Sequence, residues 1–97
     1  MATQKERELT FEILRLAIEV NESGRADVHV EYSGDSVHIY IVPMPYKANN
    51  EWLYYANDHA YFSGKAFKES EFIRVANEYI AEIKKHHPAY DSDGVKL

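Results

Sequence analysis

The stretch Ala26 to Val42, ADVHVEYSGDSVHIYIV, carries the clearest local pattern in this chain. Two runs that alternate apolar and polar residues flank a short polar turn, which is the pattern of a β-hairpin. One face of the hairpin would carry Val28, Val30, Tyr32, Val37, Ile39 and Ile41, and the other would carry His29, Glu31, His38 and Tyr40. We expect the apolar face to anchor the core and the second face to stay open.

A two-residue turn at Gly34-Asp35 would suit type II′, which takes glycine in its first central position. That turn pairs Tyr32 with Val37, Glu31 with His38, Val30 with Ile39, and His29 with Tyr40. A longer turn would change the partners, but an even shift would leave every side chain on the same face.

The residues before the hairpin predict a helix. Thr3 and Glu6 have the spacing of a capping box, so the helix should begin there and run to about Glu22. Gly24 follows where a left-handed helix end favours glycine.

The apolar arc of this helix is about 200° wide, more than contact with one sheet requires. Phe11, Leu14 and Ile18 form its outlying edge. Either a second helix or another subunit would cover that edge, and we expect the cover to come from within the chain.

Residues 43–50, PMPYKANN, predict a stiff loop that could present Met44 and Tyr46. Residues 51–56, EWLYYA, predict a third strand that is apolar on both sides. Its contribution to the open face is therefore either Trp52 and Tyr54 or Leu53 and Tyr55. Residues 60–62 either extend the sheet or lead into the last helix.

A second amphipathic helix is predicted around Phe72 to Ile83, with Ser63 or Ser70 as its N-cap and Pro88 after its end. The chain thus predicts an α+β domain of order αβββα over residues 1–88. Three antiparallel strands, or four, would carry both helices on one face. Residues 89–97 are expected to be a flexible tail.

The composition and charge of the chain exclude several kinds of site. The absence of cysteine excludes disulfides and thiolate zinc sites. No apolar run approaches the roughly 20 residues that cross a bilayer, and the N-terminus lacks the apolar core of a signal peptide, so we expect a cytoplasmic protein without membrane contact. Residues 25–64 hold two basic and five acidic residues, a net charge of −3, which opposes phosphate binding by the predicted sheet.

His29, Glu31 and His38 have the ligand types of a metal site with two histidines and one carboxylate. Cross-strand neighbours lie about 4.5–5.5 Å apart, so Glu31 and His38 could share an ion. His29 lies two residues along the strand from Glu31, about 6.5–7 Å away, which strains convergence. A solvated Glu–His pair explains the same residues, and we expect no metal and no cofactor.

The chain also offers no nucleophile–base pattern and no glycine-rich phosphate loop, so we expect a non-enzymatic protein. Its αβββα order resembles that of double-stranded RNA-binding domains, which grip phosphates with a lysine cluster at the start of the second helix. At the matching place here, Glu69 and Glu71 offset Lys65 and Lys68. The resemblance therefore covers topology alone, and we expect no nucleic-acid binding.

Eight tyrosines, four phenylalanines and one tryptophan are many for 97 residues. Short, acidic, cysteine-free and tyrosine-rich, the chain resembles in profile the small phage-encoded accessory proteins, including host-defence inhibitors such as anti-CRISPR proteins. The resemblance assigns no residue to a role. It implies a protein-binding domain whose protein partner is unknown.

Tyrosine and tryptophan on an open sheet face are typical anchors of protein interfaces. The predicted partner-binding residues are His29, Glu31, His38, Tyr40, Tyr46, Trp52 and Tyr54. The alternative is a homodimer formed through the Phe11, Leu14 and Ile18 edge or through the sheet face.

Overall fold

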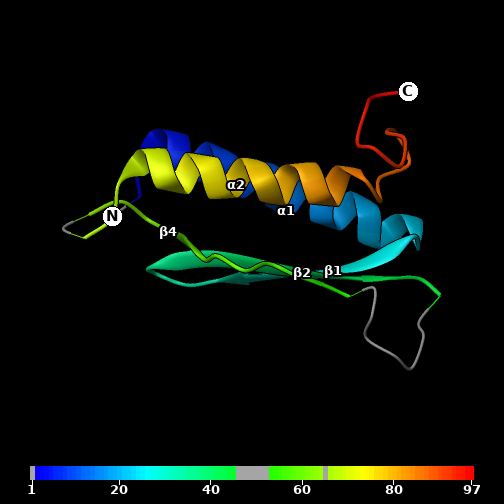
Figure 1. Ribbon diagram of the computed structural model, residues 1–97, viewed down its shortest axis with the longest axis horizontal. Helices are drawn as coiled ribbons and strands as arrows, with labels where there is room; N and C mark the ends of the chain where they lie inside the picture. Colours follow the sequence, from blue (N-terminus) through cyan, green and yellow to red (C-terminus); the bar gives the residue numbers. More distant parts are fainter. Residues whose placement is uncertain (1, 46–52, 65) are drawn as a thin grey trace.

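The computed structural model describes residues 2–45, 53–64 and 66–97. Its elements are α1 (Gln4–Ser23), β1 (Ala26–Tyr32), β2 (Ser36–Pro43), β3 (Tyr54–Tyr55), β4 (Ala60–Tyr61) and α2 (Glu69–Lys84). The two helices lie side by side over one face of an open antiparallel sheet, and the other face carries no helix (Figure 1). The predicted α+β fold with helix, strands and helix in that order is confirmed.

α1 begins and ends where its sequence predicts. The Thr3 side chain accepts from the backbone of Glu6, and the Glu6 carboxylate accepts from the backbone of Thr3, which completes the capping box. Gly24 takes the left-handed conformation with φ of 76°. The helix thus stops at a residue that tolerates positive φ without a steric penalty.

The hairpin has the predicted register, with Glu31 opposite His38 and His29 opposite Tyr40. The type II′ turn is wrong, because positive φ among the glycines occurs at Gly24 and Gly94 and not at Gly34. Instead, the N–H of Ser33 donates to the carbonyl of Ser36 at 3.0 Å. The Ser33 hydroxyl donates to the Asp35 carboxylate at 2.6 Å, so side-chain bonds help to close the turn.

The third strand is interrupted. β3 pairs Tyr55 with Tyr40, and β4 pairs Ala60 with Val37. Tyr40 and Val37 are three residues apart in β2, whereas their partners are five residues apart. Two extra residues are therefore inserted, at the bend of Asn57-Asp58. Because the insertion is even, the side chains after it stay on the same faces as those before it.

The core lies between the sheet and the helices. α1 lies over β1, and α2 lies over β4. The buried apolar residues are Leu9, Ile13, Leu16, Ala17, Val20, Ala26, Val28, Val37, Ile39, Ile41, Ala56, Ala60, Phe62, Phe72, Val75, Ala76, Tyr79, Ile80 and Ile83. Tyr54 packs against this core, since it is paired with Ile41 on the helix-covered face.

The N-cap of α2 differs from its prediction. Lys68 occupies the position, without a side-chain capping bond, and Ser70 lies inside the first turn. Ser63 is committed elsewhere: its N–H and its hydroxyl both donate to the carboxylate of Glu6, at 2.9 and 3.2 Å. Because Ser63 hydrogen-bonds to α1, it does not cap α2, although the local sequence pattern favoured it for that role.

The expected intramolecular cover of the α1 edge is also wrong. Phe11 is 66% exposed and Ile18 is 57% exposed. α2 packs against the opposite flank of α1, over β4, so none of the helices and strands that the structure describes covers the Phe11 side.

A side chain from α1 protects the outer edge of β1. The amide of Asn21 accepts from the N–H of Val28 at 2.6 Å and donates to the carbonyl of Val28 at 3.1 Å. Both main-chain groups of Val28 are thereby paired within the chain. An added strand could not pair at this residue without displacing Asn21.

Residues 89–97 follow a defined path at the end of α2. Asp91 donates its N–H to the carbonyl of Val95 at 2.8 Å, and Leu97 donates to that of Ala89 at 3.0 Å. These bonds close a small loop. The flexibility expected of this tail stays a prediction.

Candidate binding face

Seven aromatic rings form a continuous row on the sheet face opposite the helices, which we call the aromatic row. Its members are, in order of contact, His29, Tyr40, Tyr55, His38, His59, Tyr61 and Phe67. The successive centroid distances are 4.2, 6.0, 4.6, 4.3, 5.7 and 4.4 Å. The members from His29 to Tyr61 follow from strand alternation, the hairpin register and the even insertion in the third strand, and Phe67 joins them from the segment after β4.

The two ends of the row are its most parallel stacks. His29 lies over Tyr40 with 8° between the ring planes, and Tyr61 lies over Phe67 with 10°. Tyr55 is 58% exposed, Phe67 46% and Tyr61 39%. The face therefore offers solvent three large rings, of which the two tyrosines carry hydroxyls that can form hydrogen bonds.

His38 is the buried member of the row and is only 1% exposed. Its Nε2 lies 2.8 Å from the carbonyl oxygen of Ala56, and its Nδ1 lies 3.2 Å from a carboxylate oxygen of Glu31. A neutral imidazole has one N–H, so only the doubly protonated ring can donate to both oxygens. His38 occupies the predicted face, but its burial beside His59 and Tyr55 makes it a support for the row rather than a contact for a partner.

The histidines that have the ligand types of a metal site do not converge. His29 places its Nε2 3.0 Å from Asp27, whereas His38 contacts Glu31. In the part of the chain that the structure describes, no group of three histidine, aspartate or glutamate side chains has the spacing of a metal site. The hairpin face thus holds two separate imidazole–carboxylate contacts.

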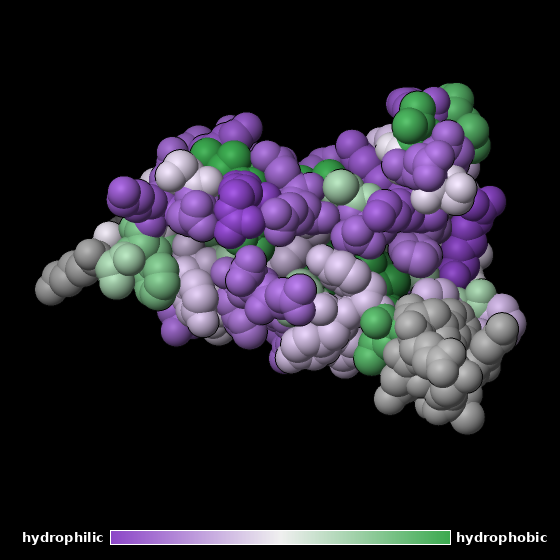
Figure 2. All heavy atoms as spheres, in the orientation of Figure 1, coloured by the Kyte–Doolittle hydropathy of each residue, from purple (hydrophilic) through white to green (hydrophobic). Residues whose placement is uncertain are grey.

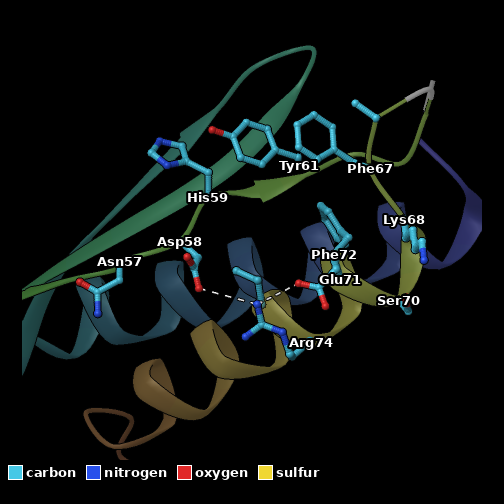
Figure 3. A pocket seen from close by; sticks show the side chains of 12 residues that line it. Asn57, Asp58, His59, Tyr61, Phe67, Lys68, Ser70, Glu71, Phe72 and Arg74 are labelled. Carbon is cyan, nitrogen blue, oxygen red and sulfur yellow. Dashed lines mark hydrogen bonds and ion pairs between the residues drawn. The ribbon is translucent and has the colours of Figure 1, made fainter.

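A cleft of about 670 Å³ lies between the Tyr61 and Phe67 end of the row and the first turns of α2. Figure 3 shows His59, Tyr61 and Phe67 on one wall, and Arg74 opposite them with lines to Asp58 and Glu71. The guanidinium of Arg74 lies 3.0 Å from Glu71, 2.9 Å from Glu78 and 3.7 Å from Asp58. Since three carboxylates already surround this cation, the cleft is not an anion site centred on Arg74.

Sequence reasoning located part of this face. His29, Glu31 and Tyr40 lie on it as predicted. Tyr54 is a correction, since the pairing with β2 turns it to the core and puts Tyr55 on the open face. Tyr46 and Trp52 lie outside the described residues.

His59, Tyr61 and Phe67 were missed. The alternation in His59-Ala60-Tyr61-Phe62 was a usable signal for the first two, because it matches a strand with one buried side. Phe67 follows β4 in an irregular segment, and no local pattern indicates that it stacks on Tyr61.

Comparison of the chain with protein-family models, with curated proteins and with solved structures finds no match. Neither helix, within the residues described, has the length and apolarity that crossing a bilayer requires.

Proposed function

We propose that this is a small non-enzymatic protein-binding domain that binds its partner through the aromatic row. The observation that supports this is the row itself: seven rings in contact on a sheet face that no helix or strand of the described residues covers, with Tyr55, Tyr61 and Phe67 exposed. Rigid aromatic side chains contribute large contact areas at low conformational cost, and tyrosine is enriched among the residues that dominate binding energy.

The charge around the row favours a protein over a nucleic acid. Proteins that stack nucleic-acid bases on aromatic side chains place them in a positively charged groove. The described sheet segments, residues 26–45 and 53–64, contain neither lysine nor arginine. The first turn of α2 carries Glu69 and Glu71 directly after Lys68, so the place where a duplex-RNA-binding domain concentrates lysines holds charges of both signs.

The profile of the chain supports a more specific role. It is short, acidic and rich in tyrosine, like phage-encoded accessory proteins that inhibit host-defence proteins in the cytoplasm. We propose that role for it, with a host protein as partner.

Affinity capture from the source cell tests the proposal. The tagged protein is compared with a Tyr55→Ala/Tyr61→Ala double variant and with Phe11→Ala as the matched control. Phe11 is an exposed aromatic residue on α1, outside the row. Circular dichroism and thermal unfolding verify that all three proteins are folded.

A partner that binds the wild type and the Phe11→Ala control, and is lost from the double variant, supports the proposal. A partner that a folded double variant retains as well as the wild type does would overturn it. The double variant truncates two exposed rings of the row and the control truncates one exposed ring on α1, so the comparison tests whether rings of the row are required.

A second candidate is a homodimer formed through the outer flank of α1. Phe11 and Ile18 are exposed there, and Tyr32, which lines the same groove as Phe11, is 65% exposed. An apolar groove of about 230 Å³ lies on this flank, lined by Ala2, Arg7, Thr10, Phe11, Leu14, Tyr32 and Phe62. Light scattering at high micromolar concentration should then give twice the monomer mass for the wild type and one monomer mass for Phe11→Ser/Ile18→Ser. A monomeric wild type would contradict this candidate.

A further inference from the structure

We infer that the partner presents a cationic, arginine-containing segment to the aromatic row. The inference rests on the proposed function, because it names the chemistry of the partner that the row would bind. The observation behind it is the distribution of carboxylates, lysines and arginines over the described sheet and helices.

In the sheet segments that the structure describes, the carboxylates are not balanced by lysine or arginine. The described sheet segments carry four carboxylates, Asp27, Glu31, Asp35 and Asp58. Within the described residues, the contacts of Asp27 and Glu31 are the imidazoles of their neighbouring histidines, and Asp35 accepts from the Ser33 hydroxyl. Asp58 alone of the four lies within ion-pair distance of an arginine, Arg74.

The helix layer differs. Each carboxylate there that forms an ion pair with a lysine or arginine does so within its own helix: Glu12 and Glu19 with Arg15, Glu71 and Glu78 with Arg74, and Glu82 with Lys85. Hydrophilic side chains cover the outer surface of α2 in Figure 2. Opposite charges are thus interspersed over the helices, while the sheet face keeps an excess of negative charge.

The carboxylates lie one contact away from the rings. Glu31 contacts His38, whose ring lies 4.6 Å from that of the exposed Tyr55. Asp27 contacts His29 in the same way, and His29 stacks on Tyr40. Two places on the face therefore combine an aromatic surface with a nearby carboxylate.

A guanidinium suits both groups at once. It is planar and stacks on aromatic rings, and its fork of N–H donors matches a carboxylate. A lysine ammonium is a compact, strongly hydrated charge and makes less use of a stacked ring. The face is therefore expected to prefer arginine to lysine in its partner.

Calorimetric titration with synthetic peptides tests this. The probe is a peptide of alternating arginine and serine, and lysine–serine and glutamate–serine peptides of equal length are compared with it at low ionic strength. Asp27→Asn/Glu31→Gln removes two charges from the sheet face. Glu8→Gln/Glu22→Gln removes two exposed charges from α1 and serves as the control.

We expect the arginine peptide to bind more tightly than the lysine peptide, and the glutamate peptide not to bind. The sheet-face variant should weaken binding about tenfold, as the loss of two surface ion pairs implies, and the control by less than about twofold. Equal weakening by both variants, equal affinity for arginine and lysine, or no binding of the arginine peptide would overturn the inference.

The same variants separate this inference from the proposed function. The captured cellular partner could be lost from Tyr55→Ala/Tyr61→Ala but bind Asp27→Asn/Glu31→Gln with unchanged affinity. In that case the row binds a protein, and the inference that the partner is cationic is wrong. If the partner is retained by the tyrosine variant, the row itself is not the interface.

Discussion

The carboxylate of Glu6 joins the start of α1 to Ser63, 57 positions away. One carboxylate oxygen accepts the backbone N–H of Ser63 at 2.9 Å, and the other accepts the backbone N–H of Thr3 at 2.8 Å. The side chain is fully buried. A capping residue thus also fastens the segment between β4 and α2 to the first helix.

Glu6→Gln should destabilise the fold by about 1.5–3 kcal/mol near pH 7, the value of hydrogen bonds to a charged group. Burial acts to raise the pKa of Glu6, but the hydrogen bonds from Thr3 and Ser63 outweigh it and lower the pKa below the ordinary 4.5. The carboxylate therefore stabilises the fold at pH values above its pKa in the unfolded chain. This stability is lost as the pH falls through its lowered pKa in the folded protein. Urea unfolding across acidic pH measures this.

The variant should lose part of that acid dependence. Glu8→Gln is the control, because Glu8 is exposed and its hydrogen bond to Gln4 lies on the helix surface. The free energy of unfolding of this control should differ from that of the wild type by no more than about 0.5 kcal/mol. A Glu6→Gln protein with the stability and acid response of the wild type would contradict the role of the carboxylate.

Asn21→Ala should both destabilise the protein and expose the edge of β1. The N–H and carbonyl of Val28 lose their partner, which costs about 1–3 kcal/mol if they stay buried. An unprotected edge strand also pairs with other chains, so size-exclusion chromatography should show concentration-dependent association. Asn21→Asp still accepts from the N–H of Val28 but cannot donate to its carbonyl. Its stability should fall between those of the wild type and Asn21→Ala.

Tyr79→Phe should cost about 1–2 kcal/mol, measured by chemical denaturation, because the Tyr79 hydroxyl bonds the carbonyls of Asp58 and Val37. Asp58 lies at the insertion in the third strand, so the variant should also broaden the amide NMR signals of residues 57–61. Unchanged stability together with an unchanged spectrum would show that the insertion does not need this bond.

Burial raises the pKa of the Tyr79 phenol above its ordinary value of 10. Tyrosinate absorbance should therefore show one tyrosine that stays protonated in the native protein while most others ionise, and Tyr79→Phe should remove it. The stability from the neutral phenol is present below pH 10 and is lost as the pH rises above it.

Gly24→Ala should cost about 1 kcal/mol, because Gly24 has φ of 76° and alanine resists that conformation. Gly34→Ala is the matched control. Gly34 lacks positive φ, and a Cβ there would meet no atom within 4 Å. Equal thermal shifts for the two variants would contradict the cap at Gly24.

Much of the fold depends on patterns that lie within a few residues of one another. The alternation in residues 26–42 predicted the hairpin, its faces and its register, and Thr3, Glu6 and Gly24 predicted the ends of α1. These succeed because strand alternation and helix capping depend on the backbone next to the side chain, which any single sequence displays.

The aromatic row depended on contacts between distant residues. The insertion at Asn57-Asp58 and the pairing of Tyr55 with Tyr40 decide which tyrosines reach the row, and both arise from pairing with β2. Likewise, Ser63 does not cap α2 because Glu6 binds it. The sequence by itself determined the hairpin and the first helix. Only the tertiary structure decided where Tyr54 and Tyr55 point, since pairing between strands that are distant in the sequence has no local signature.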